Sequence, residues 1–591
     1  MDTMQGLKRT HYCGDLRISD VSKEIVVTGW VQRSRDLGQL IFTDLRDRTG
    51  VLQLAFDTET QKDIFDKAFT VRSEFVLCAK GVLRERSAKN SEIPTGDVEL
   101  AVTDLRILSK SQTPPFEIVP NSNVNEELRL TYRYLDLRRP DVQRTIITRH
   151  KIVKSARDYF DDNGFIEIET PILIKSTPEG ARDYLVPSRV HEHCFFALPQ
   201  SPQLYKQLLM LSGFDRYVQI AKCFRDEDLR ADRQPEFTQI DLEMSFVDAE
   251  DVMAIGEGFM KKVYKDVLGV DISTPFSRLR YKEAMERFGS DKPDLRFGME
   301  IADLTEILKN TEFRVFAGAL ETGSVRAIIA KNAFAKLTRK EIDKLTQWIK
   351  AYGAKGLAWT RIGDESTSSF EKFLSQDEAE AIRTRLGAQN GDVIFVVCDP
   401  DNNVVFDSLG ALRCELAKQL DIIDKSKPNL LWVTDFPLFE YDKEAQRYVA
   451  KHHPFTAPRN EDLGMMKETP EKMIARAYDL VLNGNEVGGG SIRINNPELQ
   501  QDMFKALGFT QEDAKERFGF LTDAFSYGAP PHGGMALGLD RLVMLMCDCD
   551  NIRDVIAFPK IANSGELMSG APGRVDEKQL KELNIDLIDA E

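Results

Sequence analysis

The chain has 591 residues, 42% of them hydrophobic, which is enough for ordinary buried cores and, at roughly 100–200 residues per domain, predicts about three or four domains. Its 79 basic and 95 acidic residues give a net charge of −16, which argues against a protein that coats duplex nucleic acid but leaves local basic patches possible. Eight cysteines without a CxxC pair predict reduced thiols rather than a zinc site, and the lack of a secretory apolar region or of an apolar run of about 18 residues predicts a cytoplasmic protein without a membrane span.

Residues 1–112 contain five short strand-like segments broken by turns, such as EIVVTGWVQRS and QLIFTDLRD. Five such strands predict a small closed β-barrel of the OB type. Phe42 lies among arginines that include Arg35, and aromatic rings beside guanidinium groups are a common means of binding single-stranded nucleic acid. On these residues alone, a place in the barrel core remains the alternative for Phe42.

Residues 113–140 begin with two prolines and are highly charged, so they predict a hinge. Residues 141–296 are expected to form the first part of a larger core. The stretch ITRHKIVKSARDYFDDNG predicts an amphipathic helix that buries Ile147, Ile152 and Phe160 and ends at Asn163-Gly164.

Two strands joined by a long loop follow. Val218–Arg225 reads as one strand, and residues 237–244 alternate strictly, which predicts the other. One face of the second strand carries Phe237, Gln239, Asp241 and Glu243, a set that suits a ligand as well as water. The charged loop between the strands, residues 226–236, is far longer than most hairpin turns, and such loops are often functional. An ordinary exposed hairpin is the alternative.

Residues 297–425 contain helix-like and strand-like segments that predict a separate α/β unit, and no catalytic cluster is evident among them. Residues 426–563 are expected to form the second part of the core. The tail, residues 564–591, is polar and indicates no role. The complete pattern predicts an α+β multidomain protein. A Rossmann fold or a P-loop is not predicted, because neither glycine motif occurs.

Several segments of the sequence resemble the motifs of one protein family. FRDEDLRADRQPEFTQID is similar to motif 2 of class II aminoacyl-tRNA synthetases, in the form found in aspartyl-tRNA synthetases of bacterial type. GFIEIETPIL resembles motif 1, whose proline is Pro171 here, and PPHGGMALGLDRLVMLM resembles motif 3. GWVQRSRDLGQLIFTDLRDRTGVLQL resembles the anticodon-binding barrel of the same family, so the resemblance covers nearly the whole chain.

The resemblance implies an N-terminal OB-fold barrel for the anticodon, an antiparallel-sheet catalytic core and an inserted accessory domain. It implies a homodimer, with Pro171 at the interface, that activates L-aspartate with ATP and Mg²⁺ and transfers it to tRNA(Asp). Whether tRNA(Asn) is also charged is left open. Enzymes of the family that charge both tRNAs often carry histidine at the place of Leu37, so Leu37 favours the aspartate-only type.

The resemblance also implies the residues of the site. Arg225 and Arg541 are the predicted catalytic residues, and Asp479 and Glu486 are the predicted Mg²⁺ ligands. The predicted amino-acid-binding residues are Glu179, Gln203, Lys206, Arg225, Asp241, His452 and Arg493. The predicted ATP-binding residues are Arg225, Asp226, Glu227, Gln234, Phe237, Glu486, Gly538, Leu539, Asp540 and Arg541. The predicted anticodon-binding residues are Arg35, Phe42 and Gln53.

Two alternatives stay open. One is an asparagine- or lysine-specific relative, against which TPEGARDY, HHPF and GGGSIRI argue. The other is a non-catalytic nucleic-acid-binding protein, against which the joint presence of Arg225, Glu486 and Arg541 argues. A geometric expectation also follows: Glu486 and Arg493 are separated by an odd number of residues, so they line one site only if Gly488–Gly490 contains a bulge or kink.

Overall fold

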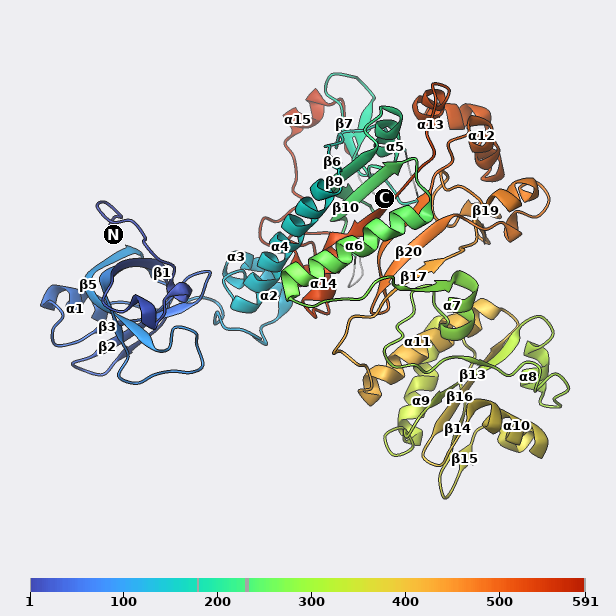
Figure 1. Ribbon diagram of the computed structural model, residues 1–591, viewed down its shortest axis with the longest axis horizontal. Helices are drawn as coiled ribbons and strands as arrows, with labels where there is room; N and C mark the ends of the chain where they lie inside the picture. The colour runs from blue at the N-terminus through green and yellow to red at the C-terminus, as the bar shows by residue number, and fades with distance from the viewer. Residues whose placement is uncertain (1, 178–179, 229–232, 589–591) are drawn as a thin grey trace. The chain divides into compact units, whose positions relative to one another are not determined.

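The computed structural model describes residues 2–177, 180–228 and 233–588 (Figure 1). Contacts divide the chain into two compact units. The first comprises Met1–Ile147 and Arg553–Gly573, and the second comprises Thr148–Ile552 and Arg574–Glu591. The domain boundaries expected at residues 112, 140, 296, 425 and 563 stay predictions.

The first unit begins with a closed barrel whose strand order is β1-β2-β3-β5-β4, which confirms the predicted OB-type barrel. Alternate side chains turn inward and fill the barrel with aliphatic groups such as Val27, Leu45 and Leu54. A bulge lies in β1 between Val31 and Arg33. The elements are β1 (Glu24–Asp36), β2 (Ile41–Arg46), β3 (Val51–Phe56), α1 (Lys62–Phe69), β4 (Val76–Glu85) and β5 (Val98–Ser109).

The expected hinge is ordered around one buried arginine. Arg133 pairs with Asp136 and donates to the carbonyl oxygens of Arg553, Ile556 and Ala557, at 3.1, 2.8 and 2.9 Å. This network fastens the two separated parts of the first unit to each other, because a buried guanidinium is stable only when its donors are satisfied. The short helices of this region are α2 (Glu126–Thr131) and α3 (Arg133–Asp136).

The second unit is built on an eight-stranded sheet with the order β11-β17-β20-β21-β22-β10-β9-β6. The central pairings are antiparallel, as predicted, and a parallel pair closes each edge, β11 with β17 and β6 with β9. The strands are β6 (Ile166–Glu167), β9 (Arg216–Phe224), β10 (Glu236–Ser245), β11 (Ser277–Arg280), β17 (Leu430–Thr434), β20 (Ala477–Leu482), β21 (Asn485–Ile492) and β22 (His532–Gly538).

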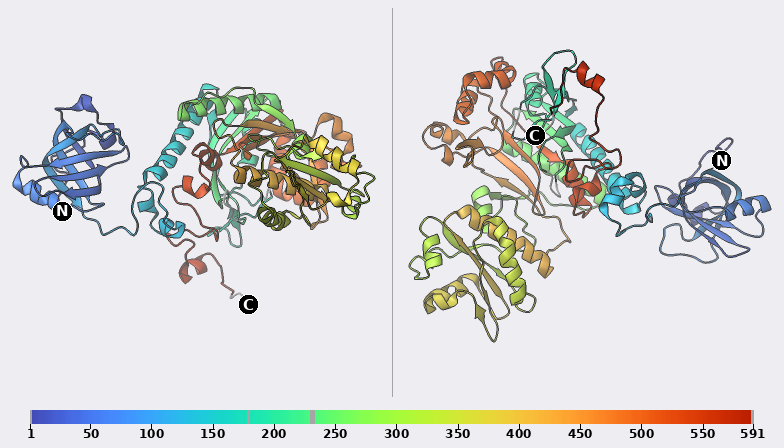
Figure 2. Two further views of the ribbon diagram at one scale, coloured as in Figure 1. Left: turned by 90° about the horizontal axis from the view of Figure 1, so that it is seen from below. Right: turned by 180° about the vertical axis from the view of Figure 1, so that it is seen from behind.

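Helix α6 (Ala249–Leu268) lies across one face of this sheet (Figures 1 and 2). Gly256 of this helix is so close to Met535 and Trp432 that a Cβ atom there would lie 3.1 and 3.2 Å from them. The opposite face of the sheet is therefore available to polar side chains. Because side chains alternate between the two faces along β10, its polar residues lie on that face. None of the described helices is long and apolar enough to cross a membrane.

Helix α4 (Pro140–Asp162) packs on α6 through Phe160 and Phe259, whose ring centroids are 5.4 Å apart. The helix begins seven residues before the stretch from which it was predicted. Ile147, expected on its buried face, is 40% exposed, whereas Ile152 is buried. The exposure of Ile147 follows from the greater length of the helix, because the apolar side chains of α4 pack toward the sheet only along its C-terminal half.

The remaining core elements flank the sheet. The helices are α5 (Gln203–Leu211), α7 (Tyr281–Phe288), α12 (Pro497–Ala506), α13 (Gln511–Phe525), α14 (Leu539–Met546) and α15 (Glu577–Glu582). Two hairpins are formed by β7 (Leu185–Pro187) with β8 (Phe195–Ala197), and by β18 (Phe439–Asp442) with β19 (Arg447–Ala450). Helices α12 and α13 share an apolar cluster with Leu204 of α5 and with Phe455, so they support two segments that reach the site.

Residues 297–425 form a five-stranded sheet of order β12-β13-β16-β14-β15 with an apolar cluster on each face, as an α/β unit requires. Arg413 of α11, buried between the rings of Phe288 and Phe297, donates to the carbonyl oxygens of Asp294, Gly298 and Met299 and so fixes the entry to this unit. Its elements are β12 (Ala302–Asp303), α8 (Arg314–Ala319), β13 (Ser324–Ala330), α9 (Arg339–Trp348), β14 (Ala358–Arg361), β15 (Thr367–Ser368), α10 (Gln376–Leu386), β16 (Val393–Asp399) and α11 (Asn402–Leu420).

Candidate active site

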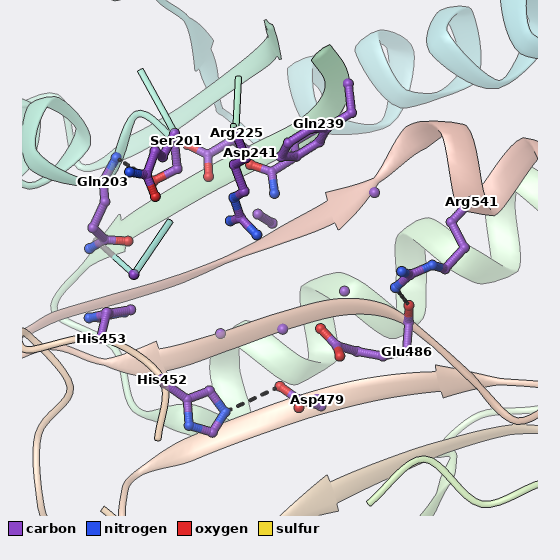
Figure 3. Close-up of a pocket in the computed structure, with 18 of the residues that line it drawn as sticks. Ser201, Gln203, Arg225, Gln239, Asp241, His452, His453, Asp479, Glu486 and Arg541 are labelled. Atoms are coloured by element: carbon purple, nitrogen blue, oxygen red, sulfur yellow. Dashed lines mark hydrogen bonds and ion pairs between the residues drawn. The ribbon is translucent and has the colours of Figure 1, made fainter. Parts of the chain in front are cut away.

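A cavity of about 560 Å³ opens on the face of the eight-stranded sheet that bears the polar side chains (Figure 3). Strands β10, β20, β21 and β22, helix α5 and the start of α14 supply its walls. Its described lining residues include most of those predicted from the sequence, namely Gln203, Lys206, Arg225, Glu227, Gln234, Phe237, Asp241, His452, Asp479, Glu486, Arg493, Gly538, Asp540 and Arg541.

At one end of the cavity, four buried charged side chains form a continuous chain of contacts. Lys206 Nζ lies 2.7 Å from Asp241 Oδ1 and 3.3 Å from Glu243 Oε2. Glu243 in turn receives two hydrogen bonds from Arg493, of 2.8 Å from Nε and 3.0 Å from Nη2. Buried charges persist only when they are paired in this way, so each member depends on the others.

The pKa values of the two carboxyl groups of this cluster are shifted in opposite directions. Burial raises the pKa of Asp241, and Lys206 offsets that effect only in part. Burial acts on Glu243 too, but the nearby Arg493 and Lys206 outweigh it and lower its pKa to about 2. Glu243 is therefore a permanent anion, whereas Asp241 is the carboxyl group that responds to its surroundings.

Arg493 is also held from its other side. Its Nη1 donates to Ser491 Oγ at 2.7 Å and to His453 Nε2 at 2.6 Å. Burial and the adjacent Arg493 lower the pKa of His453 well below its usual range, so this imidazole is neutral and can accept the hydrogen bond. Glu243 occupies the Nε–Nη2 edge of Arg493, and Ser491 and His453 engage both N–H groups of Nη1. Among the described contacts, the second N–H of Nη2 is therefore the one left for a bound carboxylate.

Several polar atoms in the cavity wall have no hydrogen-bond partner among the described residues. They are Gln203 Nε2, Arg225 Nε, Asp241 Oδ2 and His452 Nδ1. Buried polar atoms are seldom left unpaired in folded proteins, because an unmade hydrogen bond costs about 1–3 kcal/mol. Their concentration in one cavity leaves these donors and acceptors available to a polar ligand.

The other end of the cavity carries the residues predicted to meet ATP. Arg225 follows β9, and its guanidinium carbon lies 5.2 Å from the centre of the Phe237 ring. Arg541 donates from Nη1 to the carbonyl oxygen of Glu486, which fixes the first turn of α14 against β21 (Figure 3). The two arginines therefore reach the cavity from separate elements.

Asp479 of β20 and Glu486 of β21 project into the same space (Figure 3). The charge of Asp479, followed by burial, raises the pKa of Glu486, which shows that the two carboxyl groups lie close together. A Cβ atom on Gly489 would lie 2.6 Å from Asp479 Oδ1 and 3.7 Å from Glu486 Oε1. The missing side chain of Gly489 thus makes the room in which the two carboxylates converge.

The predicted irregularity of β21 exists, but not within the three glycines. Leu480 pairs with Gly488 and Val481 with Glu486, which leaves Val487 as the extra residue of a bulge. The bulge returns Glu486 to the face that carries Gly489, Ser491 and Arg493. The expectation of a shared face is confirmed, and its cause lies one residue before Gly488.

The two converging carboxylates fit a divalent cation, because Mg²⁺ prefers oxygen ligands and is usually held by one or two carboxylates together with phosphate oxygens. No cluster of three or more potential metal-binding side chains occurs in the described part of the chain. Any such ion therefore needs further oxygen ligands from a substrate or from water.

Some predicted site residues have other contacts. Asp540 receives the backbone N–H of Thr238 at 2.8 Å and pairs with Arg149, so both of its oxygens are engaged in holding α14 to β10 and α4. Leu539 is buried, and Asp226 forms a backbone bridge with Arg182; neither lines the cavity. Glu179 lies outside the described residues.

The structure also adds residues that were not among those predicted for the amino-acid, ATP or Mg²⁺ sites. Glu243 shares a face with Asp241, so the period of two was the signal for it. Gln200 was not signalled by any pattern: it donates to Ala181 O at 2.8 Å and to Asp183 Oδ1 at 2.5 Å, and so holds the chain that borders the cavity. Ser491 contacts Arg493 from two residues away on the same face, whereas His453 reaches it from a distant segment.

On the barrel of the first unit, the three predicted anticodon residues form one cluster. Arg35 Nη2 donates to Gln53 Oε1 at 3.1 Å, and the guanidinium of Arg35 lies 5.8 Å from the centre of the Phe42 ring. Phe42 is half-buried and lies outside the apolar cluster that fills the barrel, so the core alternative for it is wrong. Leu37, in the turn after β1, is 67% exposed.

Comparison with known proteins gives a consistent set of matches. Residues 125–562 match the family described as tRNA synthetases class II (D, K and N), and residues 25–108 match the OB-fold nucleic acid binding domain. The aspartate–tRNA ligase of Ruminiclostridium cellulolyticum is 60% identical over 591 residues, 99% of each chain. The aspartate–tRNA(Asp/Asn) ligase of Caldanaerobacter subterraneus subsp. tengcongensis is 58% identical over 588 residues, also 99% of each chain.

Among solved structures, an asparaginyl-tRNA synthetase from Pyrococcus horikoshii complexed with asparaginyl-adenylate is similar, with a TM-score of 0.59. It is 20% identical in sequence, and the match covers 93% of this chain and 98% of that chain. At this identity the likeness establishes the fold alone.

Proposed function

Because the chain belongs to the class II tRNA synthetases of the D, K and N group, we propose that it activates L-aspartate with ATP and transfers it to tRNA(Asp). The observation that carries the choice of amino acid is the buried cluster of Lys206, Asp241, Glu243 and Arg493 at one end of the cavity. The full-length relatives named as aspartate–tRNA ligases support the same choice.

The charges of the site match aspartate. With Asp241 ionised, the cluster of Lys206, Arg493, Asp241 and Glu243 is neutral by itself, 2 − 2 = 0, and Arg225 at the other end of the cavity adds one positive charge. Aspartate carries one ammonium and two carboxylates, a net charge of −1, whereas asparagine is neutral and lysine is positive. Of the three amino acids, only aspartate neutralises the positive charge that Arg225 adds, and an uncompensated charge in a buried site is costly.

The contacts suggest how the substrate lies. Its ammonium group would meet the unpartnered Asp241 Oδ2, with Gln203 beside it, and its side-chain carboxylate would accept the remaining N–H of Arg493 Nη2. The α-carboxylate then points toward Arg225, which lies toward the ATP end of the cavity. Positioning of this kind supplies most of what the reaction requires.

In the first step, an oxygen of the α-carboxylate attacks the α-phosphorus of ATP, and the bond to pyrophosphate breaks. The nucleophile is already an anion, so no general base is needed. Arg225 would neutralise the charge that develops between the two anions, and Arg541 would bind the far phosphates beside the adenine ring on Phe237. Asp479 and Glu486 would hold Mg²⁺, which neutralises phosphate charge when bound with ATP.

In the second step, a hydroxyl at the 3′ end of the tRNA attacks the activated carbonyl carbon, and AMP leaves. Arg35, Phe42 and Gln53 of the barrel would bind the anticodon in the single-stranded form that such a surface accepts. This work would take place in the cytoplasm.

A homodimer is part of the proposal. Pro171 and the adjacent Ile172 and Leu173 are exposed, and Ile174 next to them bridges to Ala197 at the end of β8. Exposed apolar side chains that gather on one surface are typical of subunit interfaces. Leu173→Glu should convert the dimer to monomer in light scattering; an unchanged mass would refute this interface.

The choice of tRNA is proposed to be aspartate-only, because of Leu37. One relative at 58% identity is named for both tRNA(Asp) and tRNA(Asn), so the question is experimental. Efficient aspartylation of a tRNA that carries an asparagine anticodon would contradict the aspartate-only proposal without affecting the proposed reaction.

Amino-acid-dependent exchange of pyrophosphate into ATP tests the proposed function directly. Aspartate should support rapid exchange, whereas asparagine and lysine should not. Preferential exchange with either of the other amino acids would refute the assignment, and the absence of exchange with all three would favour a non-catalytic nucleic-acid-binding role.

A further inference from the structure

A second group of cations and an aromatic ring lies on the barrel, apart from the predicted anticodon residues. The guanidinium carbons of Arg9 and Arg48 lie 4.0 and 4.7 Å from the centre of the Tyr12 ring. Arg48 Nη2 also donates to Tyr12 Oη at 3.0 Å. Both arginines are exposed and Tyr12 is half-buried, so the group faces solvent. Arg9 and Tyr12 precede the residues of both family matches, 25–108 and 125–562.

The backbone under this group is fixed. Cys13 N donates to Asp47 Oδ2 at 2.6 Å, and Gly14 N donates to Thr49 Oγ1 at 2.9 Å. Asp47 also accepts the N–H of Thr49 at 2.8 Å, and it is almost completely buried. The segment is so close to the turn between β2 and β3 that a Cβ atom on Gly14 would lie 2.1 Å from Thr49 O. Tyr12 is thus held rigidly beside Arg48.

The positive charge of the group is not neutralised. Neither Arg9 nor Arg48 forms an ion pair with a carboxylate in the described part of the chain, and Arg9 has only a long 3.5 Å hydrogen bond, to Thr28 Oγ1. The same segment also carries Lys8 and Asp15, and the buried Asp47 lies beneath it, where it is engaged by backbone N–H groups. In a chain with a net charge of −16, two uncompensated guanidinium groups fixed against one ring make a local site for anions.

We propose that Arg9, Tyr12 and Arg48 form a second RNA-binding site, which holds the phosphodiester backbone of the tRNA whose anticodon binds at Phe42. Guanidinium groups pair with phosphate through two parallel hydrogen bonds, and stacking on Tyr12 fixes the direction of those donors in advance. The proposal rests on the proposed tRNA-ligating function.

One RNA chain can reach both sites. Phe42 lies in β2 and Arg48 lies in the turn that follows it, six residues further on. At about 3.3 Å per residue, their Cα atoms are separated by at most about 20 Å. Single-stranded sites on OB-type barrels span about 4–16 nucleotides, so an anticodon arm bound at Phe42 extends over this distance.

The alternative is that the packing of Arg9 and Arg48 on the Tyr12 ring only stabilises the barrel. The two roles differ in their dependence on salt. A phosphate contact contributes to the salt dependence of RNA binding, with a slope of about 0.7 per phosphate for single strands, whereas a packing contact within the protein does not.

The test uses the full-length enzyme and an in-vitro tRNA transcript with an aspartate anticodon, with Kd measured over a series of salt concentrations. The double variant R9A/R48A should bind about tenfold more weakly at low salt. Its plot of log Kd against log salt should be shallower by roughly 1.4, the value for two phosphates. The matched control K62A/K110A removes two exposed lysines of the same unit and should leave the slope unchanged. Pyrophosphate exchange should be the same in all three proteins.

A salt slope equal to that of the wild type, or an equal loss in the control, would overturn the proposal. If R9A/R48A is unstable, R9A alone serves, because Arg9 contributes only the stack and one long hydrogen bond; its slope should fall by roughly 0.7. Failure of the proposed function looks different: the wild-type protein would then lack aspartate-dependent exchange and would not bind the transcript specifically.

Discussion

Glu243 holds Arg493 through two hydrogen bonds, of 2.8 Å between Oε1 and Nε and 3.0 Å between Oε2 and Nη2, with side-chain exposures of 0% and 2%. The contact fixes the plane of the guanidinium from behind. Because Ser491 and His453 engage Nη1, the second N–H of Nη2 is what remains for a substrate among the described contacts. Selection of the amino acid therefore belongs to the pair rather than to Arg493 alone.

Replacement of Arg493 tests the selection of aspartate. Arg493→Lys keeps the charge but loses the planar group that fits both Glu243 and a carboxylate, so activation of aspartate should weaken by about 1–3 kcal/mol. Arg493→Leu should weaken it further and reduce the preference over asparagine. The measurement is kcat/KM for pyrophosphate exchange with both amino acids, and an unchanged aspartate-to-asparagine ratio in Arg493→Leu would place selection at Lys206.

Replacement of Glu243 tests the support behind the site. The pKa of Glu243 is lowered from 4.5 to about 2, so its stabilisation is complete above pH 4.5 and is lost as the pH falls from 4.5 toward 2. The shift corresponds to about 3 kcal/mol. Glu243→Gln should lower the unfolding free energy at pH 7 by about this amount. Its unfolding free energy should also fall less than that of the wild type as the pH drops below 4.5. The measurement is the urea unfolding free energy of the catalytic unit at pH 7 and at pH 4. If the wild type and Glu243→Gln lose the same unfolding free energy between pH 7 and pH 4, the lowered pKa of Glu243 is contradicted.

Removal of Arg225 tests the phosphate end of the cavity. Arg225→Ala should reduce adenylate formation by several kcal/mol, roughly 10²–10³-fold, because a charge-assisted contact to the reacting group is lost in the transition state. The readout is single-turnover formation of aspartyl-adenylate in a variant whose thermal unfolding is unchanged. Near-normal formation would show that Arg225 has another role.

Gly489→Ala tests the place where Asp479 and Glu486 converge. The added Cβ atom would lie 2.6 Å from Asp479 Oδ1, so that carboxylate has to move, and the KM for ATP at limiting Mg²⁺ should rise roughly tenfold, about 1.4 kcal/mol. The neighbouring Gly490→Ala meets Gly534 O at 2.2 Å instead and should lower stability. If both variants merely unfold, Gly489 serves packing rather than the site.

Phe42→Ala tests the barrel surface. Loss of one stacked base should weaken tRNA binding by about 1–3 kcal/mol while aspartate-dependent pyrophosphate exchange stays intact, because Phe42 lies outside the barrel core. Fluorescence titration with tRNA gives the first quantity and the exchange assay the second. Damage of equal size to both would mean that the whole protein is destabilised.

The alternation of β10 predicted which side chains share the cavity, since a period of two leaves no freedom once one residue is placed. The same reasoning predicted an irregular β21 between Glu486 and Arg493. It could not place the bulge, because glycine permits an extra residue but does not require one, and the register is set by the pairing of Glu486 and Gly488 with the neighbouring strand β20.

Contacts between distant segments were likewise beyond the sequence. His453 reaches Arg493 only after separate segments have packed. The position of Asp540 within motif 3 indicated a ligand contact, but the structure gives its two oxygens to Thr238 and Arg149. A motif marks which residues are needed, and packing decides what each one contacts.

The parallel pairing of β11 with β17 has a consequence for how the chain was assembled. Strands that run in the same direction cannot be joined by a tight turn, so the chain that leaves Arg280 has to cross the sheet before it enters Leu430. A loop that is already long gains length at little entropic cost, about 0.6 kcal/mol per doubling. This edge of a core whose central pairings are antiparallel is therefore one place at which an additional domain, here residues 297–425, is accommodated at little cost in folding free energy.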